Sequence, residues 1–258
     1  MHNFAKLKAL LDKEADFRNS KDEVNPDKPD PILIAKKYKE EYISLICSLF
    51  AYGNAKQIVK FLSSFDFSLL KESEEKIKKE LQNHYYRFQK TKDVTAFFIT
   101  IKRLQETDSL ENIFLKGYKK ENRVIDGIKT TIESIYKVNP YNSKGYTFLI
   151  GKPPSKNPSS PYKRWNMFLR WMVREDHIDF GLWKKVKKSD LIIPLDTHTF
   201  KVSQKLGLLK RKTYDFKAAV MLSETLKLFD PDDPIRYDFA LYRIGQESKI
   251  LLLYPTHL

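Results

Sequence analysis

The spacing of apolar side chains along the chain predicts a protein built from helices. Long runs rich in Lys, Glu and Leu are separated by short turns, and few segments alternate between apolar and polar residues as β-strands do. We therefore expect an all-α protein. The expected helices cover about residues 4–17, 32–65 (one or two helices), 72–82, 94–106, 108–118, 125–138, 165–173, 179–186, 197–206, 216–229 and 235–253.

Polar residues at the ends of these runs predict where helices begin. Asn54 and Asp93 each precede an apolar run, and Asn and Asp side chains cap helix N-termini well. Two stretches rich in Pro, Asn and Ser, residues 25–31 and 139–160, are expected to be connectors. The second is the longest irregular segment of the chain.

Residues 160–208 form the stretch around which we expect the chain to be organised. Its first half is a helix with apolar side chains on more than one face: Trp165, Phe168, Leu169 and Met172 on one, and Met167 and Trp171 on another. A helix that is apolar on most sides is usually central. In the second half the chain turns at Pro194, places Asp196 at the start of a helix, and is expected to end that helix at Gly207.

Asp196 has both a structural and a chemical interpretation. As an N-cap it would stabilise its helix by roughly 1 kcal/mol, and by context alone this is the simpler explanation. The same position holds a carboxylate at the positive end of a helix, which suits stabilisation of a developing cation or placement of a nucleophile. His198 follows closely and is as compatible with a structural hydrogen bond as with catalysis.

Composition narrows the class of protein. The chain has 258 residues, of which 41% are hydrophobic, so it can bury a core as one large domain or two closely associated lobes. Its net charge of +14 favours polyanionic partners, with nucleic acid first and an anionic membrane surface second.

The single cysteine excludes several kinds of site. Cys47 alone can form neither an intramolecular disulfide nor a multi-cysteine zinc or iron–sulfur site, and its apolar neighbours predict a buried side chain. No Walker A, GxGxxG, HExxH or GxSxG motif is present, and we expect no metal or other cofactor. Without a signal peptide or a run of roughly 20 apolar residues, we expect a cytoplasmic protein with no membrane segment.

Basic residues gather on both sides of Asp196. Lys163, at the first turn of the apolar helix, is at the end where the helix dipole disfavours an ammonium group, which makes an amine available for Schiff-base chemistry. Phosphate contacts are the other expected role, although a solvated face explains the charges as well. The candidates for phosphate contacts are Arg164, Lys184, Lys185, Lys187, Lys188, His198, Lys210, Arg211 and Lys212.

Two other segments offer weaker candidates. Residues 84–88, HYYRF, could stack on a nucleobase, although packing into the core is the simpler expectation. Residues 230–234, DPDDP, could bind a cation, but the prolines favour a capped turn.

Several sequence blocks carry a resemblance to a known superfamily. The segment PLDTHTFKVSQKLGL resembles the Asp-Thr-His segment of helix-hairpin-helix (HhH-GPD) DNA glycosylases, which include endonuclease III, MutY and the alkyladenine and 8-oxoguanine glycosylases. The chain also resembles an uncharacterised bacterial family in which the same blocks occur in the same order. These blocks are FAYGNAKQI, HYYRF, KRWNMFLRWMVR, DFGLW, IIPLDTHTFKVSQKLGL, RKTYDFKAA and FDPDDPIRYDFALYRIGQ.

The resemblance implies an all-α, two-lobed fold with an active-site cleft between the lobes. Residues 32–185 would form the middle lobe, and residues 1–31 with 186–258 the terminal lobe, of one glycosylase-like unit spanning 1–258. Asp196 would be the catalytic carboxylate, and Lys163 would match the lysine of bifunctional members. The superfamily's glycine-containing hairpin is replaced by residues 157–162, NPSSPY, and the absence of a cysteine cluster excludes the iron–sulfur subset.

The leading hypothesis is a base-excision-repair DNA glycosylase that acts on a damaged base flipped from duplex DNA, with or without an AP-lyase step, as a monomer. The alternative is a non-catalytic nucleic-acid-binding module with a glycosylase-like fold. A third possibility is an enzyme of another class that uses the same cleft. The sequence leaves open which base or lesion is recognised.

Overall fold

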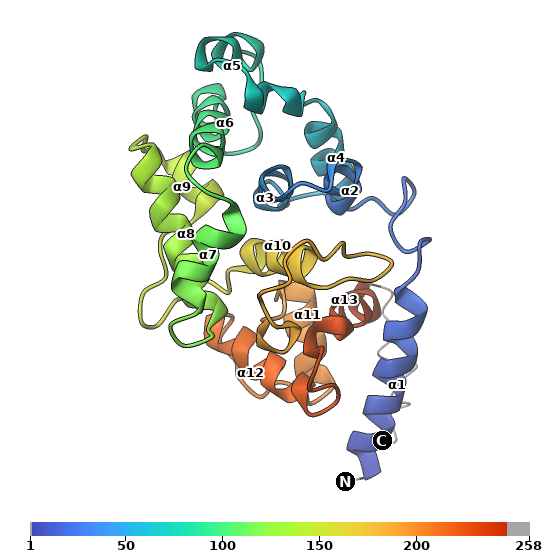
Figure 1. The fold of residues 1–258 in the computed structure, drawn as a ribbon. Coiled ribbons are helices and arrows are strands. Elements are labelled where there is room, and N and C mark those ends of the chain that lie inside the picture. The colour runs from blue at the N-terminus through green and yellow to red at the C-terminus, as the bar shows by residue number, and fades with distance from the viewer. Residues whose placement is uncertain (1, 247–258) are drawn as a thin grey trace. The chain divides into compact units, whose positions relative to one another are not determined.

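The computed structural model describes residues 2–246 (Figure 1). Over this range the chain forms thirteen α-helices and three short 3-10 helices and has no β-strand, which confirms the all-α class. The chain divides into two compact units. We call residues 26–155 the middle unit and residues 1–25 with 156–258 the terminal unit.

The middle unit contains the helices from α2 to α9. Asn54 caps α4 as expected, because its side chain accepts hydrogen bonds from the backbone N–H groups of Lys56 and Gln57. The expected helical region 32–65 is interrupted by turns that leave three separate helices. The helices are α2 (Ile32–Tyr38), α3 (Glu41–Leu49), α4 (Ala55–Ser63), η1 (Phe67–Lys71), α5 (Glu74–Glu80), α6 (Thr91–Gln105), α7 (Leu110–Tyr118), α8 (Val124–Val138) and α9 (Lys144–Ile150).

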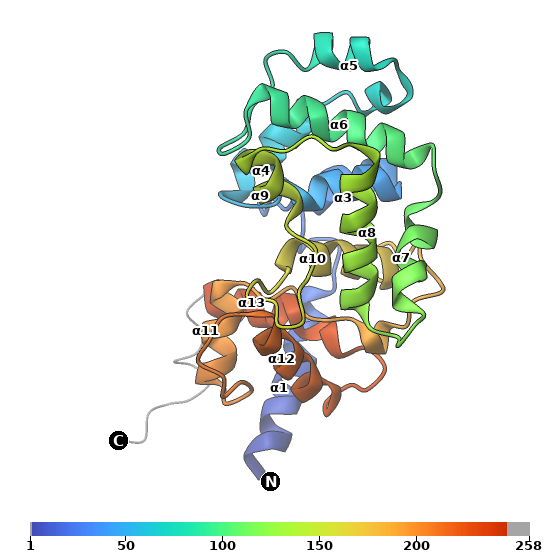
Figure 2. The ribbon, with the colours of Figure 1, turned by 90° about the vertical axis from the view of Figure 1, so that its left-hand side faces the viewer.

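Aromatic and aliphatic side chains form the core of the middle unit. Phe50 lies at its centre, with the rings of Phe61, Phe65, Tyr86 and Phe97 all within about 6 Å of its own ring. Cys47 is fully buried, as expected, and burial raises the pKa of its thiol. Helices α7 and α8 lie side by side in both ribbon views (Figures 1 and 2).

Besides the three helices found where one or two were expected, two other sequence expectations for the middle unit were wrong. Asp93 is not the N-cap of α6, because the helix begins earlier, at Thr91, and the Asp93 side chain instead accepts a hydrogen bond from the backbone of Lys90. The stretch 139–160 is not wholly irregular. It contains α9, whose N-cap Ser143 accepts from the backbone N–H of Tyr146.

The terminal unit is assembled from both ends of the chain. Its first helix packs against the last ones: Arg236 pairs with Asp16, and the Tyr237 hydroxyl donates to Asp12 at 2.7 Å. Of the expected helix 235–253, residues 247–253 lie outside the described residues. The helices are α1 (His2–Arg18), α10 (Lys163–Val173), η2 (Lys188–Asp190), α11 (Thr197–Lys205), α12 (Phe216–Lys227), η3 (Pro234–Tyr237) and α13 (Asp238–Gln246).

The boundary between the units differs from the expected one near residue 185. Helix α10 belongs to the terminal unit. Its Arg170 bonds to Asp238 at 2.5 Å and its Arg174 to Asp233 at 2.8 Å, and both carboxylates come from the C-terminal part of the chain. These long-range pairs join α10 to sequence that follows it by some sixty residues.

The short helix expected over residues 179–186 does not form. Phe180 and Gly181 instead donate their backbone N–H groups to the Trp171 carbonyl, and Trp183 donates to Met172 at 2.7 Å. The segment therefore folds back and satisfies carbonyl groups at the end of α10 that a helix leaves without partners. Gly181 has a φ of +55°, a conformation that favours glycine and permits this turn.

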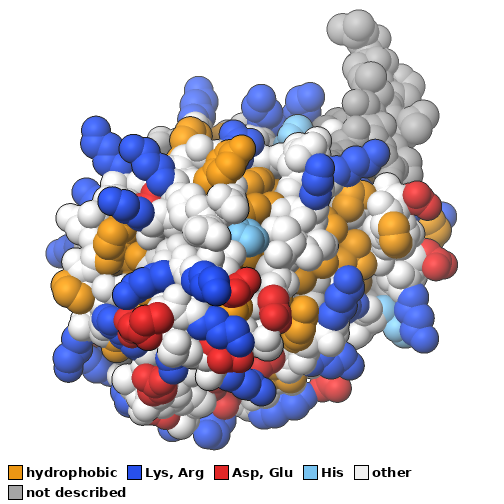
Figure 3. All heavy atoms as spheres, turned by 90° about the horizontal axis from the view of Figure 1, so that it is seen from above, with side chains coloured by type: hydrophobic (Ala, Val, Ile, Leu, Met, Phe, Trp, Pro, Cys, Tyr) orange, Lys and Arg blue, Asp and Glu red, His pale blue; other side chains and the backbone are white. Residues whose placement is uncertain are grey.

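Among the described residues, none of the helices combines the length and the apolar character that crossing a bilayer requires. On the face shown in Figure 3, Lys and Arg side chains are spread over most of the surface, with apolar side chains between them.

Candidate active site

Lys163 stands at the first position of α10, after an unusual turn. Tyr162, the residue before it, has φ 51° and ψ 36°, which is left-handed backbone that glycine adopts more readily. Asn166 holds this turn in place by donating its backbone N–H to the Tyr162 carbonyl and its side-chain amide to the Pro161 carbonyl at 3.0 Å. The turn before α10 therefore forms although residues 157–162 contain no glycine.

Asp196 is the N-cap of α11, as expected. Its Oδ1 accepts a hydrogen bond from the backbone N–H of Thr199 at 2.7 Å. The preceding residues are buried and are held in place by two hydrogen bonds: Ile193 N–H donates to Ser223 Oγ, and the Tyr214 hydroxyl donates to the Leu195 carbonyl, both at 2.9 Å. The chain on both sides of Asp196 is thus held by hydrogen bonds, and one carboxylate oxygen is bound to a backbone N–H group.

The structure brings Lys163 and Asp196 together. Lys163 Nζ lies 3.9 Å from Asp196 Oδ2, although the residues are far apart in the sequence. The lysine side chain is 36% exposed and the aspartate side chain 16%. One carboxylate oxygen caps the helix and the other is directed to the amine, so Asp196 serves as cap and charge partner at the same time.

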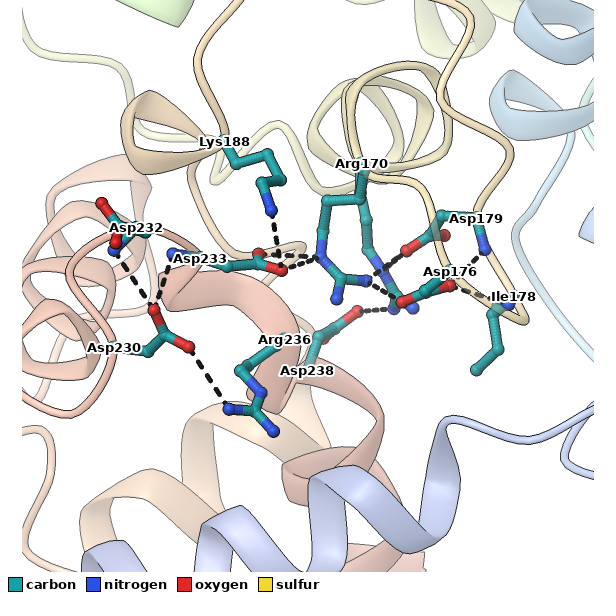
Figure 4. A network of polar contacts seen from close by, with 11 residues as sticks. Arg170, Asp176, Ile178, Asp179, Lys188, Asp230, Asp232, Asp233, Arg236 and Asp238 are labelled. Atoms are coloured by element: carbon teal, nitrogen blue, oxygen red, sulfur yellow. Dashed lines mark hydrogen bonds and ion pairs between the residues drawn. The ribbon is translucent and has the colours of Figure 1, made fainter.

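A buried network of charges lies on the same helix as Lys163. Arg170 and Arg174 share the buried carboxylate of Asp179, and Arg174 also reaches Asp233. Arg170 also reaches Asp238 (Figure 4). Burial raises the pKa of the Asp179 carboxyl, and the two guanidinium groups oppose that rise by stabilising its charge. Several ion pairs thus fix the direction of α10.

Two residues near the pair were missed by the sequence analysis. Burial raises the pKa of Asp238, and the positive charge of Arg170 opposes that rise. The negative charge of Asp196 also raises this pKa, and the positive charge of Lys163 lowers it. Burial, and then the nearby charge of Asp196, raises the pKa of Tyr214 to about 12. A lone acid inside the apolar run IRYDFALY was the available signal for Asp238; no pattern distinguished Tyr214.

The predicted phosphate-binding residues are in diverse environments. Three are engaged in ion pairs: Lys184 with Glu175, Lys188 with Asp233 at 4.0 Å, and Arg211 with Asp215. Arg164 is half-buried at the start of α10. The remaining residues are exposed: Lys185, Lys187, His198, Lys210 and Lys212.

The acidic turn after α12 is a capped turn, as expected. Asp230 Oδ1 accepts hydrogen bonds from the backbone N–H groups of Asp232 and Asp233 (Figure 4). The Asp233 carboxylate forms an ion pair with Arg174. Across the described part of the chain, no three His, Cys, Asp or Glu side chains are grouped as a metal site would need.

A separate groove lies within the middle unit, along α5 and α6. Its volume is about 490 Å³, and Lys78, Lys92 and Arg103 contribute to its lining. Arg103 is bonded to Glu74 through two nitrogens, at 2.7 and 2.9 Å. None of the site residues predicted from the sequence lines this groove.

Comparison with known proteins gives one family. The model of a family described as a protein of unknown function (DUF2400) matches residues 30–247. No curated protein and no solved structure matches the chain significantly.

Proposed function

The chain belongs to the DUF2400 family, and we propose that it is a DNA glycosylase of the helix-hairpin-helix type. In this proposal the protein binds duplex DNA and removes a damaged base that has been flipped out of the helix. Lys163 is the amine nucleophile and Asp196 the assisting carboxylate. The all-α fold, the terminal unit built from both chain ends and the resemblance around Asp196 are compatible with this proposal.

The observation that carries the proposal is the 3.9 Å approach of Lys163 Nζ to Asp196 Oδ2. A glycosylase with a lyase step needs an amine and a carboxylate close enough to act on one sugar carbon. Both side chains are partly exposed, so a substrate atom can reach them. The helix ends that carry the two residues are held by backbone and side-chain hydrogen bonds, which keep the amine and the carboxylate in a fixed relative position.

The chemistry follows from these two groups. The Lys163 amine would attack the anomeric carbon of the sugar while the bond to the base breaks and the leaving base takes up a proton. Asp196 would stabilise the positive charge that develops on the sugar. Loss of a proton from the attached amine and opening of the sugar ring would give a Schiff base, which borohydride reduces to a stable amine.

The test is borohydride trapping on duplex oligonucleotides that contain an abasic site or a lesion. We expect a covalent adduct with the wild-type protein, no adduct with Lys163→Gln, and an undiminished adduct with the control Lys129→Gln, whose side chain is 50% exposed. Asp196→Asn keeps a good N-cap, so the fold should persist while base release slows by at least about 100-fold. An adduct that survives Lys163→Gln removes that lysine from the mechanism, and wild-type rates with Asp196→Asn remove the carboxylate.

The second candidate is a non-catalytic nucleic-acid-binding module. Two observations favour it. The 3.9 Å between Lys163 Nζ and Asp196 Oδ2 is also an ordinary ion-pair distance. The turn before Lys163 lacks the glycines of the superfamily's hairpin. This candidate predicts salt-sensitive binding to DNA with no base release from any lesion tested. Absence of DNA affinity at low salt would contradict both candidates and leave an enzyme of another class.

A further inference from the structure

The middle unit carries an exposed group of aromatic rings around one arginine. We call this group, Tyr52, Arg87, Phe88 and Phe148, the aromatic patch. The rings of Phe88 and Phe148 are 4.9 Å apart, and those of Tyr52 and Phe148 are 5.0 Å apart. Tyr52 and Phe88 are almost parallel, with ring centroids 6.3 Å apart. Phe88 is nevertheless 58% exposed and Phe148 44%.

Arg87 places a positive charge against these rings. Its guanidinium carbon is 5.7 Å from the centre of the Tyr52 ring and 5.6 Å from that of Phe88, both cation–π distances. The guanidinium also lies against Gly53, where an added Cβ would stand 2.4 Å from an Arg87 nitrogen. Gly53 therefore leaves the space that the arginine occupies.

The backbone that presents Arg87 and Phe88 is firmly held. Tyr86 and Gln89 exchange two backbone hydrogen bonds, of 3.0 and 2.8 Å, and the tight turn between them consists of Arg87 and Phe88. The Gln89 side chain anchors the turn to the Gly145 carbonyl at 2.8 Å. Arg87 itself has a φ of 51°, which residues other than glycine rarely adopt, and such strain is often retained where a side chain has a task.

The surroundings of the patch are basic. Lys90 follows Phe88 closely, and Lys144 precedes Phe148 by one helical turn on the same face of α9. Both lysines are exposed. The acid nearest to Phe88 in sequence, Asp93, is buried and bonded within the unit.

We propose that the aromatic patch binds unstacked bases of single-stranded nucleic acid. Flat exposed rings offer stacking surfaces that any base can use, a guanidinium can stack in the same way, and neighbouring lysines can meet the phosphates. The proposal concerns the middle unit and requires no reaction at Lys163 or Asp196. It therefore stands whether or not the chain is a glycosylase.

The probe is a fluorescein-labelled oligothymidylate of about 10 nucleotides, and its anisotropy reports binding to the full chain at low salt. The matched competitor has the same length and phosphates but carries abasic residues in place of bases. If bases stack on the patch, the abasic oligomer should bind at least about fivefold more weakly. Equal affinity for the two oligomers would show that only phosphates are bound and would overturn the proposal.

Variants then locate the binding. Phe88→Leu and Phe148→Leu keep apolar bulk but remove the aromatic face, so each should weaken oligothymidylate binding at least about fivefold. The control is Phe17→Leu, because Phe17 is also exposed and also has an arginine, Arg18, over its ring. Patch variants that behave like Phe17→Leu would contradict the proposal.

Arg87→Gly separates binding from folding. Glycine accepts the left-handed backbone, so this variant should unfold at nearly the same denaturant concentration as the wild type while binding the oligomer more weakly. Retention of full affinity by folded Arg87→Gly would exclude the guanidinium from the patch's function.

Discussion

At the scale of single residues, two arginines of α10, Arg170 and Arg174, share one buried carboxylate. Asp179 is fully buried and accepts hydrogen bonds from both Arg170 and Arg174. Each partner alone would be a costly buried charge, but together they neutralise one another. The network therefore fixes how α10 lies, and with it the position of Lys163.

Removing the shared carboxylate should be strongly destabilising. We expect Asp179→Asn to lower the free energy of unfolding by about 3–5 kcal/mol, because two guanidinium groups then lose a buried counter-charge. Urea denaturation followed by circular dichroism measures the change. The control is Glu175→Gln, which breaks an ion pair with Lys184 whose side chains are 70% and 68% exposed, and it should cost less than about 1 kcal/mol. Similar losses for the two variants would mean that the network adds no stability.

At the scale of elements, a carboxyl group at the start of α7 makes the stability of the fold depend on pH. Asp108 accepts hydrogen bonds from Lys116, Asn112 and the backbone of Ser109, and these, with Lys116 first, lower its pKa to about 2. A carboxyl whose pKa is lower in the folded chain stabilises the fold above its ordinary value near 4. That contribution disappears as the pH falls towards 2.

The variant Asp108→Asn should therefore lose stability at neutral pH but little at acid pH. The measurement is the free energy of unfolding at pH 6, 4 and 3 for the wild type and the variant. The difference between them should shrink as the pH falls, and Lys116→Met should reproduce much of this pattern. A difference that stays constant with pH would show that the charge of Asp108 is not involved.

Two glycines allow α7 to pack closely on α8: Gly117 in α7, where an added Cβ would stand 2.2 Å from the Asp126 carbonyl oxygen, and Gly127 in α8. A Cβ at Gly127 would lie 2.4–2.6 Å from ring atoms of Phe114, so the helices approach too closely for any larger residue. We expect Gly127→Ala to lower the free energy of unfolding by about 1–3 kcal/mol, as overpacking does. Adding Phe114→Leu should restore part of the loss, and a double-mutant cycle measures this coupling. Strictly additive effects would contradict a direct clash.

Helices could be predicted from the sequence where local signals decide them. Asn54 and Asp196 cap their helices because a short polar side chain before an apolar run satisfies free N–H groups on the spot. The failure at residues 179–186 has the opposite cause. Asp179 pairs with arginines of α10, and the following backbone bonds to α10 carbonyls, so tertiary partners override the local helical pattern.

The candidate site was predictable only in part. The sequence marked Lys163 and Asp196 as candidates, and the structure places their charged atoms 3.9 Å apart. The lone acid in IRYDFALY was a signal for Asp238, but its place beside the pair depends on the later part of the chain folding back onto α10. The role of the pair in a reaction stays a prediction.

At the scale of the whole molecule, the two units differ in how the chain builds them. The middle unit is one continuous segment with its own aromatic core. The terminal unit needs both chain ends, because Arg236 in η3 pairs with Asp16 of α1 and Arg243 in α13 pairs with Glu23. Continuity predicts that the middle unit can fold by itself.

Residues 26–155 expressed alone should therefore be helical and should unfold cooperatively, as circular dichroism during heating would show. Residues 156–258 alone should not, because they lack α1 and the acidic partners of Arg236 and Arg243. Joining residues 1–25 to the N-terminus of 156–258 through a flexible linker should recover cooperative unfolding, since the covalent order matters less than the presence of α1. A gradual, non-cooperative transition for residues 26–155 would mean that its core depends on the rest of the chain. Cooperative unfolding of 156–258 alone would mean that α1 adds little to the terminal unit.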